Sequence, residues 1–128
     1  MKKIAILCFI SLLIDISCEN KHENEYEYNL VGTWNWVESC GGFTGLCWYP
    51  SEDNYRQVVF DRSMRYIEKQ NDLIVKDFQY QIIDTFINGS TTIYTIKFQD
   101  SYQTYFWFSG NRLNIQGGDF VDEYVRAK

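Results

Sequence analysis

The side chains that carry out most enzyme chemistry are scarce in this 128-residue sequence. His22 is the single histidine, and it precedes the apolar and aromatic part of the chain, which disfavours Ser-His, Cys-His and histidine-metal schemes. The run Gly41-Gly42-Phe43-Thr44-Gly45 follows a strand-like segment without opening a helix, so it does not match a dinucleotide-binding loop. Two adjacent carboxylate pairs, Glu52-Asp53 and Asp122-Glu123, remain as candidates for acid-base catalysis.

Neighbouring residues of a strand point to opposite faces, so the carboxylates of Asp122 and Glu123 are not expected to converge on one bond. We interpret both carboxylate pairs as solvated acidic surface. We therefore expect no catalytic residue, no metal site and no cofactor, and the sequence predicts a binding protein rather than an enzyme.

Side chains suited to binding are abundant, because the chain contains four tryptophans, ten tyrosines and nine phenylalanines. Aromatic side chains bury large areas and dominate both protein cores and binding surfaces. The formal net charge is -5, and no cluster of lysine and arginine follows the first three residues, which excludes a basic footprint for nucleic acid.

The first 17 residues are organised as an export signal. Lys2 and Lys3 precede an apolar run over residues 4–14, which is too short to span a bilayer as a helix. The run ends at Asp15-Ile16-Ser17-Cys18, which resembles the lipobox of bacterial lipoproteins. The resemblance implies that Cys18 is diacylated and anchors the mature chain to the outer membrane. The alternative is an ordinary secretory peptide in which Cys18 is incidental.

Residues 18–29 form a polar, acidic segment without an aliphatic side chain. We interpret this segment as a flexible tether whose root-mean-square span is roughly 18 Å. It is expected to hold a single folded domain, residues 30–128, in the cell envelope. Membrane contact is then expected through the lipid anchor only, and the domain is expected to be a monomer.

From residue 30 onward the sequence shows period-two or continuously apolar patterns separated by short turns. The predicted strands are Val31–Glu38, Tyr55–Asp61, Met64–Lys69, Leu73–Ile83, Thr91–Gln99, Tyr102–Ser109, Arg112–Gln116 and Phe120–Ala127. Connections this short make successive strands antiparallel neighbours, with Asn88-Gly89 as the strongest hairpin signal. The sequence thus predicts an all-β fold, an eight-stranded up-and-down antiparallel barrel.

One strand carries aromatic side chains on both alternating faces, with Phe106 on one and Trp107 on the other. The pleat cannot place both sets inside the barrel. Either some aromatic side chains lie on the outer wall, or one face meets a partner.

The first predicted strand contains Gly32-Thr33-Trp34, and the last ends near Arg126. A Gly-x-Trp early in the first strand, with an arginine near the end of the last, resembles the lipocalin superfamily. The closer resemblance is to small bacterial lipocalin-like domains, many of which are lipoproteins. It implies structural roles for Gly32, Trp34 and Arg126, in which the tryptophan seals the closed end of the barrel. The arginine would pack across its ring as a cation-π pair.

Cys40 and Cys47 flank the glycine-containing loop after the first predicted strand. In an exported lipoprotein, Cys8 leaves with the signal peptide and Cys18 carries lipid, so these two thiols remain and are expected to form a disulfide. A redox-active pair would usually have a Cys-x-x-Cys spacing, and a zinc site would need four ligands.

In lipocalin-like barrels the connection after the first strand lies across the open end as a lid. The expected ligand-binding residues are Phe43, Leu46, Trp48 and Tyr49 on this lid, with the inward-facing candidates Tyr80, Tyr94 and Phe106. We expect a small apolar or amphipathic molecule to bind there without being transformed. The alternative is a barrel plugged by its own aromatic side chains, which docks a partner protein or an envelope glycan through exposed aromatics.

Overall fold

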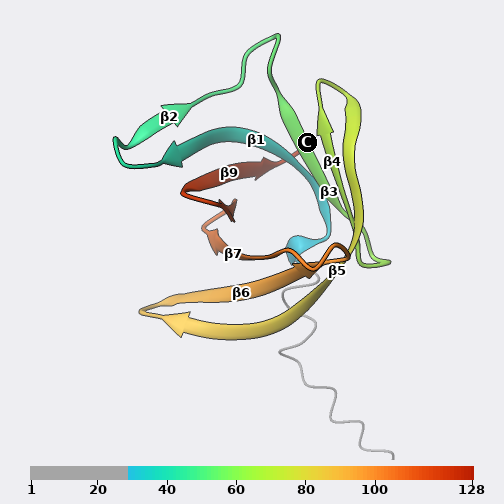
Figure 1. Cartoon of the computed structure of the whole chain (residues 1–128), viewed down its shortest axis with the longest axis vertical. Helices are drawn as coiled ribbons and strands as arrows, with labels where there is room; N and C mark the ends of the chain where they lie inside the picture. The colour runs from blue at the N-terminus through green and yellow to red at the C-terminus, as the bar shows by residue number, and fades with distance from the viewer. Residues whose placement is uncertain (1–28) are drawn as a thin grey trace, which may run out of the picture.

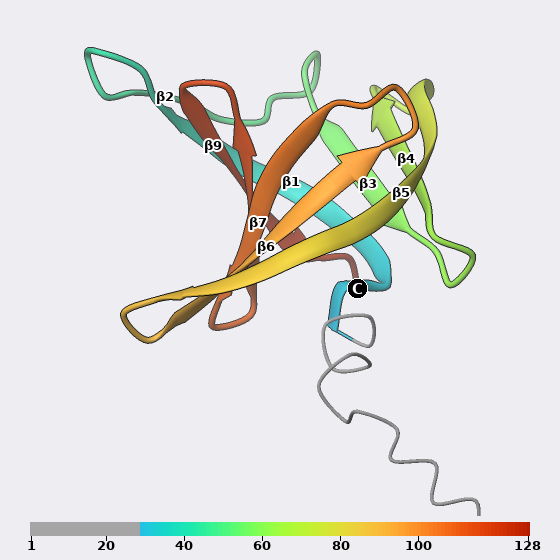
Figure 2. The same cartoon turned by 60° about the horizontal axis from the view of Figure 1, so that its bottom comes forward.

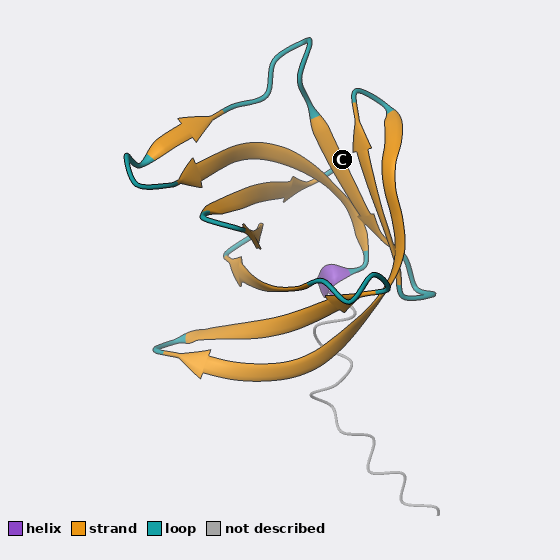
Figure 3. Cartoon of the chain, viewed as in Figure 1, coloured by secondary structure: helices purple, strands orange, loops and turns teal. Residues whose placement is uncertain are grey.

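The computed structural model describes residues 29–128, in which a helical turn at Asn29 and Leu30 leads into strands and turns (Figure 3). The predicted signal peptide, Cys18 and the predicted tether up to residue 28 lie outside the described residues. Within residues 29–128, no helix is long and apolar enough to cross a membrane.

The strands form one antiparallel sheet that curves round on itself (Figure 1). They are β1 (Gly32–Gly41), β2 (Leu46–Trp48), β3 (Arg56–Phe60), β4 (Arg65–Gln70), β5 (Leu73–Asn88), β6 (Thr91–Phe98), β7 (Gln103–Ser109), β8 (Arg112–Gly117) and β9 (Phe120–Arg126). Strands β3 to β9 follow one another in sequence order, and β1 closes the sheet by pairing with both β3 and β9. The predicted eight-stranded up-and-down barrel, formed by β1 and β3–β9, is confirmed.

Three elements differ most from the predicted strands. Strand β1 continues to Gly41 instead of ending at Glu38. The short strand β2 pairs with the last residues of β1, and we call residues 40–49 the arm because they extend from the barrel (Figure 2). Strand β5 continues to Asn88 instead of ending at Ile83. A register shift between Ile82 and Asp84 interrupts the alternation of inward and outward side chains in β5. The sequence pattern therefore does not show that the strand continues. The predicted turn at Asn88-Gly89 joins β5 to β6, and Gly89 has a positive φ of 63°.

The closed end of the barrel is sealed as the resemblance implied. The guanidinium carbon of Arg126 lies 4.3 Å from the centre of the Trp34 ring, and its nitrogens donate hydrogen bonds to two backbone carbonyls just before β1. Gly32 makes room for this side chain, since a Cβ there would lie 2.4 Å from an Arg126 nitrogen. Arg126, Trp34 and the start of β1 thus hold one another in place.

Side chains fill the barrel from this end to beyond its middle. Phe106 and Leu113 are fully buried, and Trp34 is in ring contact with Phe108. The buried apolar residues are Leu30, Trp34, Trp36, Val58, Phe60, Tyr66, Tyr80, Ile96, Phe98, Phe106, Leu113 and Tyr124. The alternation in β7 is also confirmed, because Phe106 is buried inside while Tyr105 is exposed on the outer wall. The space inside the barrel that side chains leave free lies at the opposite, open end.

Candidate functional site

Two adjoining hollows occupy the open end of the barrel, with volumes of about 470 and 280 Å³. They share the lining residues Arg56, Glu68, Gly117 and Asp122, so we treat them as one space and call it the cup. The residues of the cup lie at the ends of β1, β4 and β8 and the starts of β3 and β9. Figure 2 shows these strand ends on the side of the barrel away from the start of β1. A strand rises about 3.3 Å per residue, so the five steps along β1 from Trp34 to Ser39 separate the sealed end from the cup network by at most about 17 Å.

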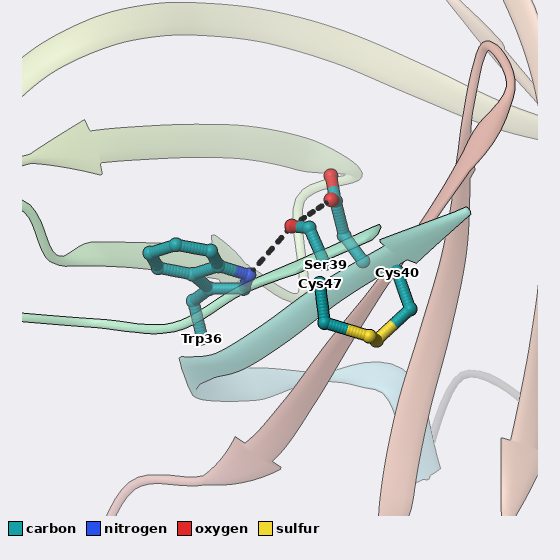
Figure 4. The surroundings of a disulfide bond; sticks show 5 residues. Trp36, Ser39, Cys40 and Cys47 are labelled. Carbon is teal, nitrogen blue, oxygen red and sulfur yellow. Dashed lines mark hydrogen bonds between the residues drawn. A yellow bond between two sulfur atoms is a disulfide. The ribbon is translucent and has the colours of Figure 1, made fainter. Parts of the chain in front are cut away.

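A hydrogen-bond network around the Ser39 hydroxyl forms part of the cup wall (Figure 4). The indole Nε1 of Trp36 and the Nη2 of Arg56 both donate to Ser39 Oγ, each at 2.8 Å. The hydroxyl in turn donates to Asp122 Oδ1. A serine hydroxyl has one donor and two acceptor sites, so this oxygen is fully used.

Arg56 is held in place by a ring contact, an ion pair and a hydrogen bond. Its guanidinium carbon lies 4.2 Å from the centre of the Trp36 ring, and its Nη2 is 3.5 Å from Asp122 Oδ1. The Arg56 and Asp122 side chains are 22% and 19% exposed, so the ion pair is only partly hydrated. A charged group fixed in this way is preorganised for a ligand that enters the cup.

A bulge in β1 places these residues together. The register with β9 changes between Trp36 and Glu38, so that Trp36 faces Tyr124 and Ser39 faces Asp122. One extra residue in β1 reverses the alternation, and two side chains three positions apart then share the inner face. Strict alternation would place Ser39 outside, which is why the sequence pattern misses it.

Glu68 and Tyr66 form the other polar part of the cup. The Tyr66 hydroxyl donates to Glu68 Oε2 at 2.8 Å, and Lys76 Nζ lies 3.2 Å from the same oxygen. Burial, with smaller effects from neighbouring groups that include Glu68, raises the pKa of Tyr66 well above its ordinary value. Burial also raises the pKa of Tyr124, whose side chain lines the same hollow. Both phenols therefore stay protonated at neutral pH.

Charge and apolar surface are both present in the cup. The smaller hollow is lined by the cations Arg56 and Lys76 and by the carboxylates Glu68, Asp100 and Asp122, an excess of one negative charge. The aromatic lining residues of the two hollows are Trp36, Trp48, Phe120, Tyr66, Phe78, Phe98, Tyr102 and Tyr124. This arrangement suits a molecule with one polar part and one apolar part.

The sequence-predicted ligand residues are distributed over three places. Trp48 lines the cup, where its ring lies edge-on to Phe120 at 5.0 Å. Tyr80 and Phe106 point inward as expected but belong to the packed core, and Tyr94 stacks on Phe106 at 4.9 Å.

The remaining predicted ligand residues, Phe43, Leu46 and Tyr49, lie on the arm and are more than half exposed. None of these three lines the cup, whereas Trp48 of the same arm does. The arm continues the hairpin of β1 and β2. The role of the arm as a lid therefore stays a prediction.

The disulfide between Cys40 and Cys47 is present and links facing residues of β1 and β2 (Figure 4). The nearby glycines allow the turn to approach β9, since a Cβ at Gly41 would lie 2.3 Å from the carbonyl oxygen of Asp119. The bridge therefore fixes the base of the arm directly beside Ser39.

The predicted surface position of Asp122 is wrong. Asp122 faces the interior and pairs with Arg56, because alternation along β9 points it into the cup. The expectation that Asp122 and Glu123 do not converge is confirmed, as Glu123 lies on the outer wall and accepts a hydrogen bond from Arg112 at 2.9 Å. Glu38 faces Glu123 in the ladder, and the hydrogen bond between them raises the pKa of Glu38 and lowers that of Glu123.

Within residues 29–128, no group of three or more histidine, cysteine or carboxylate side chains is arranged to hold a metal ion. Comparisons of the chain with protein-family models, with curated proteins and with solved structures find no match. The lipocalin-like resemblance therefore stays a prediction, and the geometry of the cup carries the functional argument.

Proposed function

We propose that the chain is a lipid-anchored binding protein that holds a small amphipathic molecule at the open end of its barrel without transforming it. The observation that carries this proposal is the fixed polar network of Arg56, Ser39 and Asp122 in a cup that also has aromatic walls. Side chains fill the closed half, so the ligand lies shallowly, with its polar group at the network and its apolar part against the aromatic rings.

The charges of the cup favour one class of polar group. Asp122 balances Arg56, and Lys76 balances Glu68, which leaves the carboxylate of Asp100 to set the sign of the field. A cationic, zwitterionic or uncharged polar group meets no net repulsion there, whereas a carboxylate does. Apolar burial against the aromatic walls contributes about 25 cal/mol per Å² of apolar surface removed from water.

The place of the described N-terminal end supports the anchored arrangement. Asn29 accepts a hydrogen bond from Arg126 at the closed end, opposite the cup. In a chain acylated at Cys18, the tether would join the domain at this end, opposite the cup.

The test uses the chain without its signal peptide and with Cys18→Ser to prevent acylation. Dodecyltrimethylammonium, dodecylphosphocholine and dodecanoate share one tail length and differ in head-group charge. We expect the first two, each below its critical micelle concentration, to shift the NMR signals of Arg56 and Trp36, with dodecanoate binding more weakly. Native mass spectrometry of the purified protein would also detect a molecule that co-purifies.

Absence of binding by all three probes would contradict the cup proposal. It would favour the second candidate, an interaction protein, which the exposed apolar side chains Phe43, Leu46 and Tyr49 on the arm support. Arg56→Met separates the two functions, because it breaks the polar network with Ser39 and Asp122 in the cup and leaves the arm unchanged.

A further inference from the structure

A third hollow lies on the outer wall of the barrel, over β5 to β8, and has a volume of about 400 Å³. The cross-strand pairs place its side chains on the face opposite the core: Tyr105 and Trp107 alternate in β7 with Thr104 and Phe106, which are buried inside. The hollow and the cup have only Gln116 in common among their lining residues. It is therefore a second concave site that the proposed function does not use.

Aromatic side chains form the apolar part of this hollow. Phe86 and Tyr105 meet edge to face at 5.9 Å between ring centres, and each is more than 40% exposed. Trp107 lies next to Tyr105 along the same face of β7. Exposed aromatic rings that cluster in a hollow, away from the core, are a feature of binding sites.

The polar part consists of uncharged amides and a hydroxyl. Asn88 and Thr91 come from the β5–β6 turn, and Gln116 comes from the end of β8. The lining contains no lysine, arginine, aspartate or glutamate, although the chain as a whole carries a net charge of -5. Recognition at this hollow therefore depends on ring stacking and neutral hydrogen bonds.

The size of the hollow suits a small ring, because about 400 Å³ is within the range of small-molecule sites. A pyranose ring has C–H groups that pack on an aromatic face and hydroxyls at its edge that exchange hydrogen bonds with amides. We propose that this outer-wall hollow binds one unit of a neutral carbohydrate chain.

The test uses the same Cys18→Ser chain and three neutral oligosaccharides, hexa-N-acetylchitohexaose, cellohexaose and maltoheptaose. At millimolar concentration, at least one sugar is expected to shift the NMR signals of Tyr105, Trp107 and the Asn88 side-chain amide. The signals of Ser39 and Arg56 in the cup are expected to stay in place. This result is independent of ligand binding in the cup, so either proposal can fail alone.

Trp107→Ala is expected to weaken sugar binding about tenfold or more, as removal of a central aromatic side chain does in other binding sites. Phe43→Ala removes an exposed aromatic side chain on the arm and serves as the matched control, with no loss expected. Thr91→Arg, at the exposed turn, blocks the hollow without touching the core and covers the case in which Trp107→Ala does not fold.

Four results would overturn the proposal. The first three are the absence of binding by all three sugars, unchanged binding after Thr91→Arg, and an equal loss after Phe43→Ala. A dimer in sedimentation that Thr91→Arg dissociates would assign the hollow to a second copy of the chain instead.

Discussion

Replacing Ser39 with alanine tests whether the cup network is an ordered structural unit. The substitution removes the acceptor of Trp36 Nε1, whose side chain is 4% exposed, and of one Arg56 nitrogen, together with the donor to Asp122. A buried donor left without a partner costs about 1–3 kcal/mol, and hydrogen bonds to charged groups are at the upper end of the ordinary range. We expect Ser39→Ala to lower the free energy of unfolding by about 2 kcal/mol.

The matched control is Ser109→Ala. The Ser109 hydroxyl accepts one hydrogen bond, from Asn114 Nδ2 at 3.2 Å, and no charged group takes part. Its loss is expected to cost about 1 kcal/mol or less. In a domain of this size, the two substitutions then lower the melting temperature by about 8–16 °C and by about 8 °C or less, respectively.

Urea unfolding followed by tryptophan fluorescence, with the disulfide intact, measures both variants. A double-mutant cycle with Asp122→Asn measures the interaction free energy between Ser39 and Asp122. This energy is expected to exceed about 0.5 kcal/mol, because the two groups belong to one network. If Ser39→Ala costs no more than Ser109→Ala, water replaces the hydroxyl freely. Arg56 would then not be preorganised by this network.

Three further predictions concern the closed end, the outer wall and the arm. Gly32→Ala is expected to destabilise the barrel in thermal unfolding, and less so in an Arg126→Ala background, because its Cβ would lie 2.4 Å from an Arg126 nitrogen. Glu38→Gln is expected to raise the melting temperature at pH 7 and not at pH 4. The pKa of Glu38 is raised in the folded state, so protonated Glu38 stabilises the fold at acid pH. This stabilisation is lost as the pH rises through the raised pKa, because the ionised Glu38 carboxylate then faces Glu123. Cys47→Ser is expected to cost at most about 2.5 kcal/mol, with faster hydrogen exchange confined to the arm.

The sequence predicted the barrel well because its evidence is local. Period-two patterns and short turns such as Asn88-Gly89 define most strands, and their sequential pairing follows from the turn lengths. Trp34 and Arg126 could be paired from their positions in the first and last strands. Cys40 and Cys47 could be paired because lipidation and removal of the signal peptide would leave no other thiol.

The cup was hard to predict because it depends on a bulge. The register shift between Trp36 and Glu38 turns Ser39 inward, and nothing in the residue types of β1 marks the extra residue. Asp122 and Glu123 are adjacent acidic residues, and only the register of β9 determines which one faces inside. The aromatic excess, in contrast, first indicated binding, but much of it belongs to the core. Phe106 fills the barrel and leaves the polar residues at the open end to distinguish ligands.

The filled closed half also determines how a ligand in the cup gains its affinity. A deep apolar cavity would let a ligand bury its whole surface, but here the space begins only at Tyr66 and Tyr124. Apolar contacts alone then distinguish poorly between ligands of similar tail length. The fixed Arg56 and Asp122 lose little freedom when a polar group binds, so their contribution is not offset by an ordering cost. Head-group chemistry, rather than the number of aromatic rings, is therefore expected to determine which molecule the cup holds.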